Sequence, residues 1–520
     1  MSKILFLTLL TIAGCTQDFN KNTLYVHLGT EPPTLDPSRA ESVVDIRILQ
    51  NISEPILEYN EKLELKGAMA VNWNISEDGL TISFELNRNK VWSDGRPLTS
   101  ENYLYGILRT LDPKVDSKLA YLLYPIKNAK AYKIGNIKEA SAVGISAPNP
   151  HTLVVRLEEK SVDFIHAFAS VITFPQRRDV VEKFGDRYGS EAHLTSSGPF
   201  TLDEWKHEKE IILSENKSYG GLPKPQVKRI IARMVPEGIT ALSLFETDKI
   251  DILEQIPLEG IRRLKDDPRM RVYPDFSTYF VGFNVRKKPF NDARVRKAFI
   301  MGIDRNNLDK ILVGSQPIAY SFVPPGLKGF DDALGIKFNP DKARELLTSA
   351  GFPGGKDFPP VEIGFNSHER HQQIAEWLEQ EWRKNLNVSV SLNSEEWKVY
   401  LTTLSLNPPH LYRFAWAAVF PDPLSMLLLW TKNNPNNYSG WYSPKYDFLI
   451  SEISRTSDSA VRLERINEAQ RLILENDPPF IPLYFYARHI LVNPRVTGFK
   501  ANGLGVLSYK YISLDDKVSK

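Results

Sequence analysis

VEIGFNSHERHQQIAEWLEQEWRKNLNVSVSL, residues 361–392, is the stretch that decides the fold class. Residues 361–366 predict a strand, and residues 387–392 predict another. Between them, residues 368–386 predict a helix, since their apolar side chains recur at helical spacing: Ile374, Trp377, Leu378 and Trp382. Strand, helix and strand with short joins form a βαβ unit, which favours a parallel sheet. This half of the chain is therefore predicted to be α/β.

Outward from this unit, the sequence predicts further helices and strands. A helix begins after Asn339, has Pro340 in its first turn and ends at Gly351. Earlier in the chain, strands are predicted at residues 24–30, 79–89, 152–158 and 210–216. A chain of 520 residues is too long for one compact core. We therefore predict two α/β lobes with a boundary near residue 275.

The charge balance argues against a nucleic-acid partner. The chain has 65 Lys and Arg against 63 Asp and Glu, a net charge of +2, and no long basic run stands out. Phosphate binding needs a concentrated positive face. We expect no nucleic acid among the partners.

The first fifteen residues, MSKILFLTLLTIAGC, predict a targeting segment. The apolar run at 4–13 is too short to span a bilayer but long enough for the core of a signal peptide. Its end, residues 12–15, resembles the bacterial lipoprotein box, which implies cleavage of a signal peptide at 1–14 and lipid attachment to Cys15. Residues 15–22 would then be a tether on a membrane surface. The alternative is a stray cysteine in an ordinary signal peptide.

The search for catalytic motifs is mostly negative. The chain has no Gly-x-Ser-x-Gly sequence. His368 and His371 lie three positions apart, so a metal site is conceivable, but two solvated residues at a helix start are the favoured interpretation. Gly354 and Gly355 indicate a helix-ending turn rather than a phosphate loop. We expect no enzyme activity, no cofactor and no metal.

Several segments, in order and at matching spacing, resemble the oligopeptide/dipeptide-binding proteins of bacterial ABC importers, which are extracellular solute-binding proteins of family 5. The resemblance extends from about residue 24 to 500. The segments that carry it are GTEPPTLDP at 29–37, VWSDGRPLT at 91–99, SGPF at 197–200 with NKSY at 216–219, GFN at 282–284 with PFNDARVRKAF at 289–299, and IPLYFY at 481–486.

This resemblance implies an α/β, two-lobed periplasmic-binding-protein-like fold of the class II type with an extra inserted domain. The implied divisions are lobe one at 23–53, 185–275 and 483–520, an inserted domain at 54–184, and lobe two at 276–482. The ligand would lie in the cleft between the lobes, which close over it by hinge bending. The main chain of an extended peptide would pair with protein backbone in the manner of a strand.

The apolar stretch FAWAAVFPDPLSMLLLW, residues 414–430, begins with FAWAAVFPDP, which is predicted to be a strand that forms part of the ligand wall, with Pro-Asp-Pro at 421–423 as its exit turn. The family's Trp-x-x-Asp pattern falls on Trp416 and Val419, so a valine stands where the resemblance implies an acid for the peptide ammonium. Burying an ammonium without a counter-charge costs several kcal/mol. Either another acid such as Asp422 takes this role, or the amine is held elsewhere, or the ligand is not a standard free peptide.

Further ligand contacts are implied by position in the family pattern. Arg413 matches a basic residue that can bind a ligand carboxylate with both of its terminal nitrogens. A second basic position of the family falls on Leu404. The remaining implied contacts are Glu41, Val43, Tyr279, Asn284, Trp397, Ala417 and Phe485, and for each aromatic residue a place in the core is an equal alternative.

The sequence thus predicts a monomeric, lipid-anchored protein on the periplasmic or cell-surface face of a bacterial membrane. It would capture peptides and deliver them to the permease and ATPase subunits of an ABC importer. Two alternatives stay open. The solute could be a modified peptide, a thiol tripeptide, a metal chelate or an opine-like compound, or the protein could be a peptide-sensing receptor or chaperone.

Overall fold

The computed structural model describes residues 22–189, 194–312, 316–432 and 434–515. The predicted signal peptide and Cys15 lie outside these residues. Across the described ranges, none of the helices has both the length and the apolar character needed to cross a bilayer.

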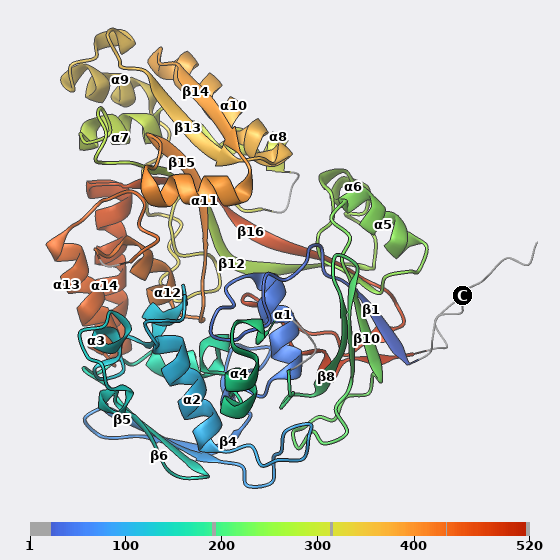
Figure 1. The fold of residues 1–520 in the computed structure, drawn as a ribbon. Coiled ribbons are helices and arrows are strands. Elements are labelled where there is room, and N and C mark those ends of the chain that lie inside the picture. The colour runs from blue at the N-terminus through green and yellow to red at the C-terminus, as the bar shows by residue number, and fades with distance from the viewer. Residues whose placement is uncertain (1–21, 190–193, 313–315, 433, 516–520) are drawn as a thin grey trace, which may run out of the picture.

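A ten-stranded mixed sheet connects the two halves of the molecule (Figure 1). Its central strands are β12 (Met270–Phe283) and β16 (Phe480–Val492), which pair antiparallel. Outward from β12 the sheet continues with β15 (Leu411–Ala417), β13 (Val361–Asn366) and β14 (Val390–Glu395). Outward from β16 it continues with β11 (Ile252–Leu253), β1 (Thr23–His27), β10 (Arg229–Arg233), β9 (Glu210–Glu215) and β8 (Phe200–Lys206).

The βαβ unit predicted from residues 361–392 is confirmed. Strands β13 and β14 pair in parallel, and α10 (Glu369–Leu386) connects them and buries its apolar stripe in one hydrophobic core. The second strand begins at Val390 rather than at residue 387. The reason is that Asn387 ends the helix in the left-handed conformation, with φ of 57°, which cannot continue into a strand.

Helices cover this part of the sheet and form a second core beside it. The predicted helix after Asn339 is α9 (Pro340–Ser349), which packs against α7 (Ala293–Met301). Further helices of this half are α8 (Asp309–Leu312), α11 (Trp397–Leu406), α12 (Pro423–Leu427), α13 (Pro444–Arg455) and α14 (Ser459–Arg471). The last three pack together beneath β12 and β15 in an aromatic core.

A separate four-stranded sheet lies in the range predicted as the inserted domain. Its order is β4 (Ala70–Ile75), β5 (Thr81–Leu86), β7 (Thr152–Arg156) and β6 (Ile145–Asn149). Helix α2 (Ser100–Leu111) packs against β6 and β7. In Figure 1 this sheet lies at the bottom, and the short α3 (Ala129–Lys133) lies next to α12, α13 and α14.

The other elements are short. The helices are α1 (Val43–Ile52), α4 (Arg178–Phe184), α5 (Gly238–Glu246) and α6 (Leu258–Arg263). Three two-stranded sheets pair β2 (Leu57–Tyr59) with β3 (Leu65–Gly67), β17 (Val496–Thr497) with β20 (Ser513–Leu514), and β18 (Ala501–Asn502) with β19 (Gly505–Val506). The mixed architecture confirms the α/β prediction.

Candidate ligand-binding site

Arg413 is the charged centre of the candidate site. It projects from β15 and is buried, and its terminal nitrogens donate to Asn366 Oδ1 (3.2 Å) and to the Tyr486 hydroxyl (3.0 Å). Its guanidinium lies 4.7 Å from the ring centre of Tyr279. Its Nε is buried without a hydrogen-bond partner, and no carboxylate among the described residues pairs with it. A buried arginine of this kind requires an anion to balance its charge.

The groups around Arg413 add no negative charge. Burial, with the nearby charge of Arg413, lowers the pKa of His371 to about 2, so this imidazole is neutral at physiological pH. The Tyr279 hydroxyl lies 3.4 Å from His371 Nδ1, and burial raises the pKa of Tyr279. This cluster of Arg413, His371, Tyr279 and Tyr486 is suited to a carboxylate, which a guanidinium binds with two parallel hydrogen bonds.

The same strand also offers unpaired backbone. Along its whole length β15 pairs with β12, but β13 pairs with it only at Leu411 and Tyr412. Ala418 N–H donates to Phe276 O on the β12 side. Because backbone groups of a strand alternate between its two edges, those of Ala415 and Ala417 face away from β12. This segment is therefore an open strand edge that begins next to Arg413.

Trp416 and Val419 mark the far end of this edge. Trp416 is half-buried and its Nε1 donates to Ser425 O (3.0 Å), while Ala417 is exposed. Val419 N–H donates to Ser425 Oγ (2.6 Å), and its side chain lines a cavity of about 740 Å³.

Two predicted contacts, Glu41 and Val43, belong to the other half of the molecule, on either side of Ser42, which caps α1. Both are exposed, and the exposed fraction of Val43 is 64%. Burial, and beyond it the charge of Glu41, raises the pKa of Tyr438, whose ring packs edge-on against Phe414 of β15 at 5.4 Å. The charge of Glu41 is therefore felt at Tyr438, which contacts the strand that carries Arg413.

The other expected contacts lie elsewhere or are buried. Trp397, at the start of α11, is 43% exposed and neighbours Tyr400, whose hydroxyl donates to Arg413 O (2.7 Å). Asn284 is buried and its Nδ2 donates to Pro408 O (2.8 Å). Phe485 is buried against Phe330. As ligand contacts these residues stay predictions.

Asp422 is already engaged within the protein. Its carboxylate caps α12 by accepting from Leu424 N–H (2.8 Å), and it accepts from both terminal nitrogens of Arg462 at 2.8 Å. Arg462 also pairs with Asp163 from the range predicted as the inserted domain. Asp422 is therefore not a free acid that could bind a ligand ammonium.

His368 and His371 behave differently from two solvated histidines. His368 is the N-cap of α10, and its Nδ1 accepts from Arg370 N–H (3.2 Å), whereas His371 is buried beside Arg413. The expectation that both are solvated is wrong for His371, because the helix turns its side chain toward β12. Within the described residues, no group of three or more His, Cys, Asp or Glu side chains is placed to hold a metal ion.

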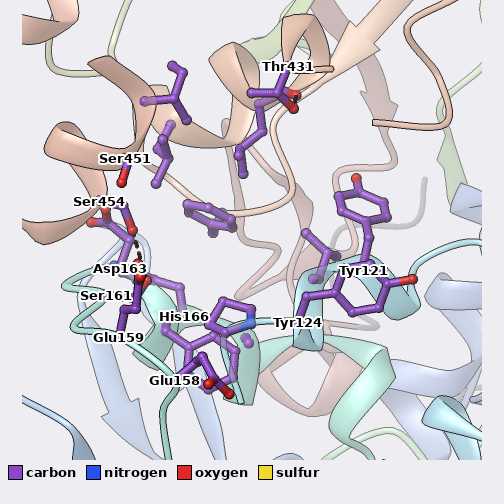
Figure 2. Close-up of a pocket in the computed structure, with 18 of the residues that line it drawn as sticks. Tyr121, Tyr124, Glu158, Glu159, Ser161, Asp163, His166, Thr431, Ser451 and Ser454 are labelled. Atoms are coloured by element: carbon purple, nitrogen blue, oxygen red, sulfur yellow. Dashed lines mark hydrogen bonds between the residues drawn. The ribbon is translucent and has the colours of Figure 1, made fainter. Parts of the chain in front are cut away.

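The sequence did not reveal the cavity beside Val419. Figure 2 shows it between segments from the range predicted as the inserted domain and helices α12 and α13. Its walls include Tyr121, Tyr124, Phe164, His166, Phe420, Leu424, Leu428 and Ile450. These segments lie about 300 residues apart in the chain, and local patterns carry no signal for such a pairing.

Two α/β halves joined by a shared sheet, with an open strand edge beside a buried arginine, define a ligand-capturing protein. Comparison with known proteins gives the family. The sequence model of bacterial extracellular solute-binding proteins, family 5 (middle part), matches residues 64–438, more than half of the chain. The chain belongs to this family.

Individual relatives and solved structures agree with this assignment. The oligopeptide-binding protein OppA of Bacillus subtilis is 30% identical over 94% of this chain and 92% of its own length. The periplasmic oligopeptide-binding protein OppAIV of Borrelia burgdorferi has a similar structure, with a TM-score of 0.86, 27% identity, and coverage of 95% of this chain and all of its own. The murein tripeptide binding protein MppA of Escherichia coli matches with a TM-score of 0.86 and 27% identity, over 95% of this chain and 99% of its own. The predicted two-lobed binding-protein fold is confirmed.

Proposed function

We propose that this protein binds peptides in the cleft between its two lobes and delivers them to the permease and ATPase subunits of an ABC importer. The bound peptide adds as a strand to the edge of β15 at Ala415 and Ala417, and its terminal carboxylate pairs with Arg413. Backbone pairing of this kind gives affinity without selecting side chains. The relatives named for oligopeptides and a murein tripeptide support this proposal.

The single observation that carries the proposal is the position of Arg413. It is buried, it lacks a carboxylate partner in the described part of the chain, and it lies where the open edge of β15 begins. A ligand that offers both a carboxylate and free backbone amides satisfies both features at once. A peptide has this combination.

The proposal includes the sequence-based division of the chain. Lobe one comprises 23–53, 185–275 and 483–520, the inserted domain 54–184, and lobe two 276–482. Lipid on Cys15 would hold the monomeric protein at the periplasmic or cell-surface face of the membrane, within reach of the permease. Binding and release need no bond to be broken, so the proposed activity is non-enzymatic.

The test has two stages. Native mass spectrometry of protein purified from its host identifies the bound ligand. Calorimetric titration then compares one tetrapeptide as the free acid and as the carboxy-terminal amide. We expect the amide to bind about 1.5–3 kcal/mol more weakly, since it loses a charged hydrogen bond to Arg413.

The variant Arg413→Gln extends this test. It should weaken binding of the free acid by a similar amount and leave the amide almost unaffected. Thermal unfolding of the variant controls for its folding. Equal affinities of acid and amide for the unmodified protein would contradict the carboxylate role, and no binding of either would contradict the peptide proposal.

A further inference from the structure

Among the described residues, two parts of the chain line the cavity beside Val419. Its walls come from residues 121–170, which include the loop at 158–163, and from residues 419–455. Its volume of about 740 Å³ lies in the range of pockets that bind small ligands. Val419 follows the last residue of β15 by two positions, so this chamber begins where the open strand edge ends.

The inner wall of the chamber is aromatic and neutral. His166 stacks on Phe420 with parallel rings 5.8 Å apart, and its Nδ1 is hydrogen-bonded to the Tyr59 hydroxyl at 2.8 Å. Burial lowers the pKa of His166 to about 4, so the imidazole carries no charge at physiological pH. Tyr121 and Tyr124 lie beside His166 and also line the chamber (Figure 2). Half-buried rings of this kind favour an apolar group.

The acidic side chains of the chamber wall are already engaged with protein groups. Glu159 pairs with Arg455, and Asp163 pairs with Arg462. Glu158 accepts the backbone N–H of Asn128 (3.0 Å) and Asp447 accepts that of Lys432 (3.3 Å). Lys130, Lys160 and Arg455 line the same chamber, so a cationic occupant would meet basic side chains, whereas a neutral apolar occupant fits the aromatic wall.

The proposed peptide orientation leads to this chamber. With its carboxylate at Arg413, the peptide's amino end lies toward Val419. Arg413 and Ala417 are four positions apart in a strand, about 13 Å, which is close to the length of a tetrapeptide backbone. The amino end of a short peptide therefore reaches the mouth of a chamber whose inner wall is aromatic and uncharged, where an uncompensated ammonium is unfavourable.

We propose that the chamber receives an apolar acyl group on the amino end of the bound peptide, so that the preferred ligands are short N-acylated peptides with a free carboxylate. This inference rests on the proposed peptide-binding function. It assigns a ligand class to the chamber, and the acyl chain lies against Phe420, Phe164 and the two tyrosines.

The test uses tetra-alanine in three forms: free amine, N-acetyl and N-octanoyl, each with a free carboxylate. Titration calorimetry should show the octanoyl form binding at least tenfold more tightly than the acetyl form. The acetyl form should bind more tightly than the free amine. Equal affinities of the octanoyl and acetyl forms would overturn the chamber assignment while leaving the peptide function intact. Failure of all three to bind would instead overturn the peptide function itself.

A second comparison locates the acyl chain. Ser451 lines the chamber from α13 and is half-buried, so Ser451→Phe should fill part of the volume. We expect this variant to lose the octanoyl advantage and to keep its affinity for the acetyl form, with Ser451→Ala as the matched control. An octanoyl advantage that persists in Ser451→Phe places the chain elsewhere and overturns the proposal. The proposal would also be overturned if octanoate alone bound as tightly as the octanoylated peptide.

Discussion

At the scale of single residues, the main feature is the buried guanidinium of Arg413. Desolvation by itself disfavours its charged form, but the surrounding tyrosines, among them Tyr486 and Tyr279, keep its pKa raised. A guanidinium that remains charged in a buried, carboxylate-free setting is a preorganised anion site. Its tyrosine partners fix the orientation of the guanidinium, so little further conformational entropy is lost when a carboxylate binds.

Val419 is the second residue at which we expect ligand choice to be decided. We expect Val419→Asp to increase affinity for tetra-alanine with a free amine, because the new carboxylate can form a charged hydrogen bond with the ammonium. The gain should be on the order of 1.5–3 kcal/mol in calorimetric titration.

Val419→Asn is the matched control for this prediction, because it has nearly the same shape without the charge. It should give a much smaller gain. Unchanged titration heats for the aspartate variant would show that the amine is bound away from position 419.

At the scale of elements, the loop at 158–163 contacts the end of α13 and the first turn of α14, which are distant from it in the chain. Val162 N–H donates to Ser454 O (2.9 Å), and Arg462 lies between Asp163 and Asp422. Two carboxylates therefore share one cation in a buried place. Burial, and next the charge of Asp422, raises the pKa of Asp163 to about 7.

This contact predicts a pH-dependent stability. Because the pKa of Asp163 is raised in the folded protein, its contribution to stability is fully present below about pH 4. That contribution is lost as the pH rises through about 7. The variant Asp163→Asn has no carboxyl group that titrates at this position. Between about pH 5 and 8, the free energy of unfolding of the variant should therefore fall less than that of the unmodified protein. The difference should be on the order of 2 kcal/mol in denaturant titrations.

Glu159→Gln is the control for the pH prediction, since it changes the neighbouring, more exposed pair with Arg455. Its pH dependence should resemble that of the unmodified protein. Identical pH profiles for Asp163→Asn and the unmodified protein would mean that the buried carboxyl does not titrate in this range.

For the whole molecule, the long pair of β12 and β16 is the structural link between the two halves. Their pairing is interrupted between Pro274 and Thr278. The loss of ladder hydrogen bonds at such an irregularity makes bending easier there than in the regular parts of the strands. We therefore expect the proposed lobes to rotate about this position.

Small-angle X-ray scattering checks this expectation. The radius of gyration should decrease when a binding tetrapeptide is added, because the lobes close over it. The carboxy-terminal amide, at a concentration where it does not bind, is the control. An unchanged radius despite measurable heat of binding would mean that the protein binds without closing.

The local elements were largely predictable from the sequence. The α10 stripe of Ile374, Trp377, Leu378 and Trp382 predicted its helix, and the strands at 361–366 and 210–216 appear almost as expected. These patterns are local because neighbouring backbone hydrogen bonds and side-chain periodicity set them. The short motifs along the chain carried the family resemblance for the same reason.

The surroundings of the site depended on tertiary structure. Arg413 acquires its character from Asn366, His371 and Tyr486, which lie on three other elements. Asp422 was a candidate ammonium partner in the sequence, and only the position of Arg462, 40 residues later, shows that it is engaged.

The sequence by itself determined the βαβ unit at 361–392, the α/β class and the family. Tertiary structure alone decided which charges are balanced inside the protein, and it created the chamber beside Val419 from residues 121–170 and 419–455. The physical reason is the sequence distance over which each kind of interaction acts. Backbone hydrogen bonding and periodicity act over a few residues, whereas burial and ion pairing depend on which distant segments meet.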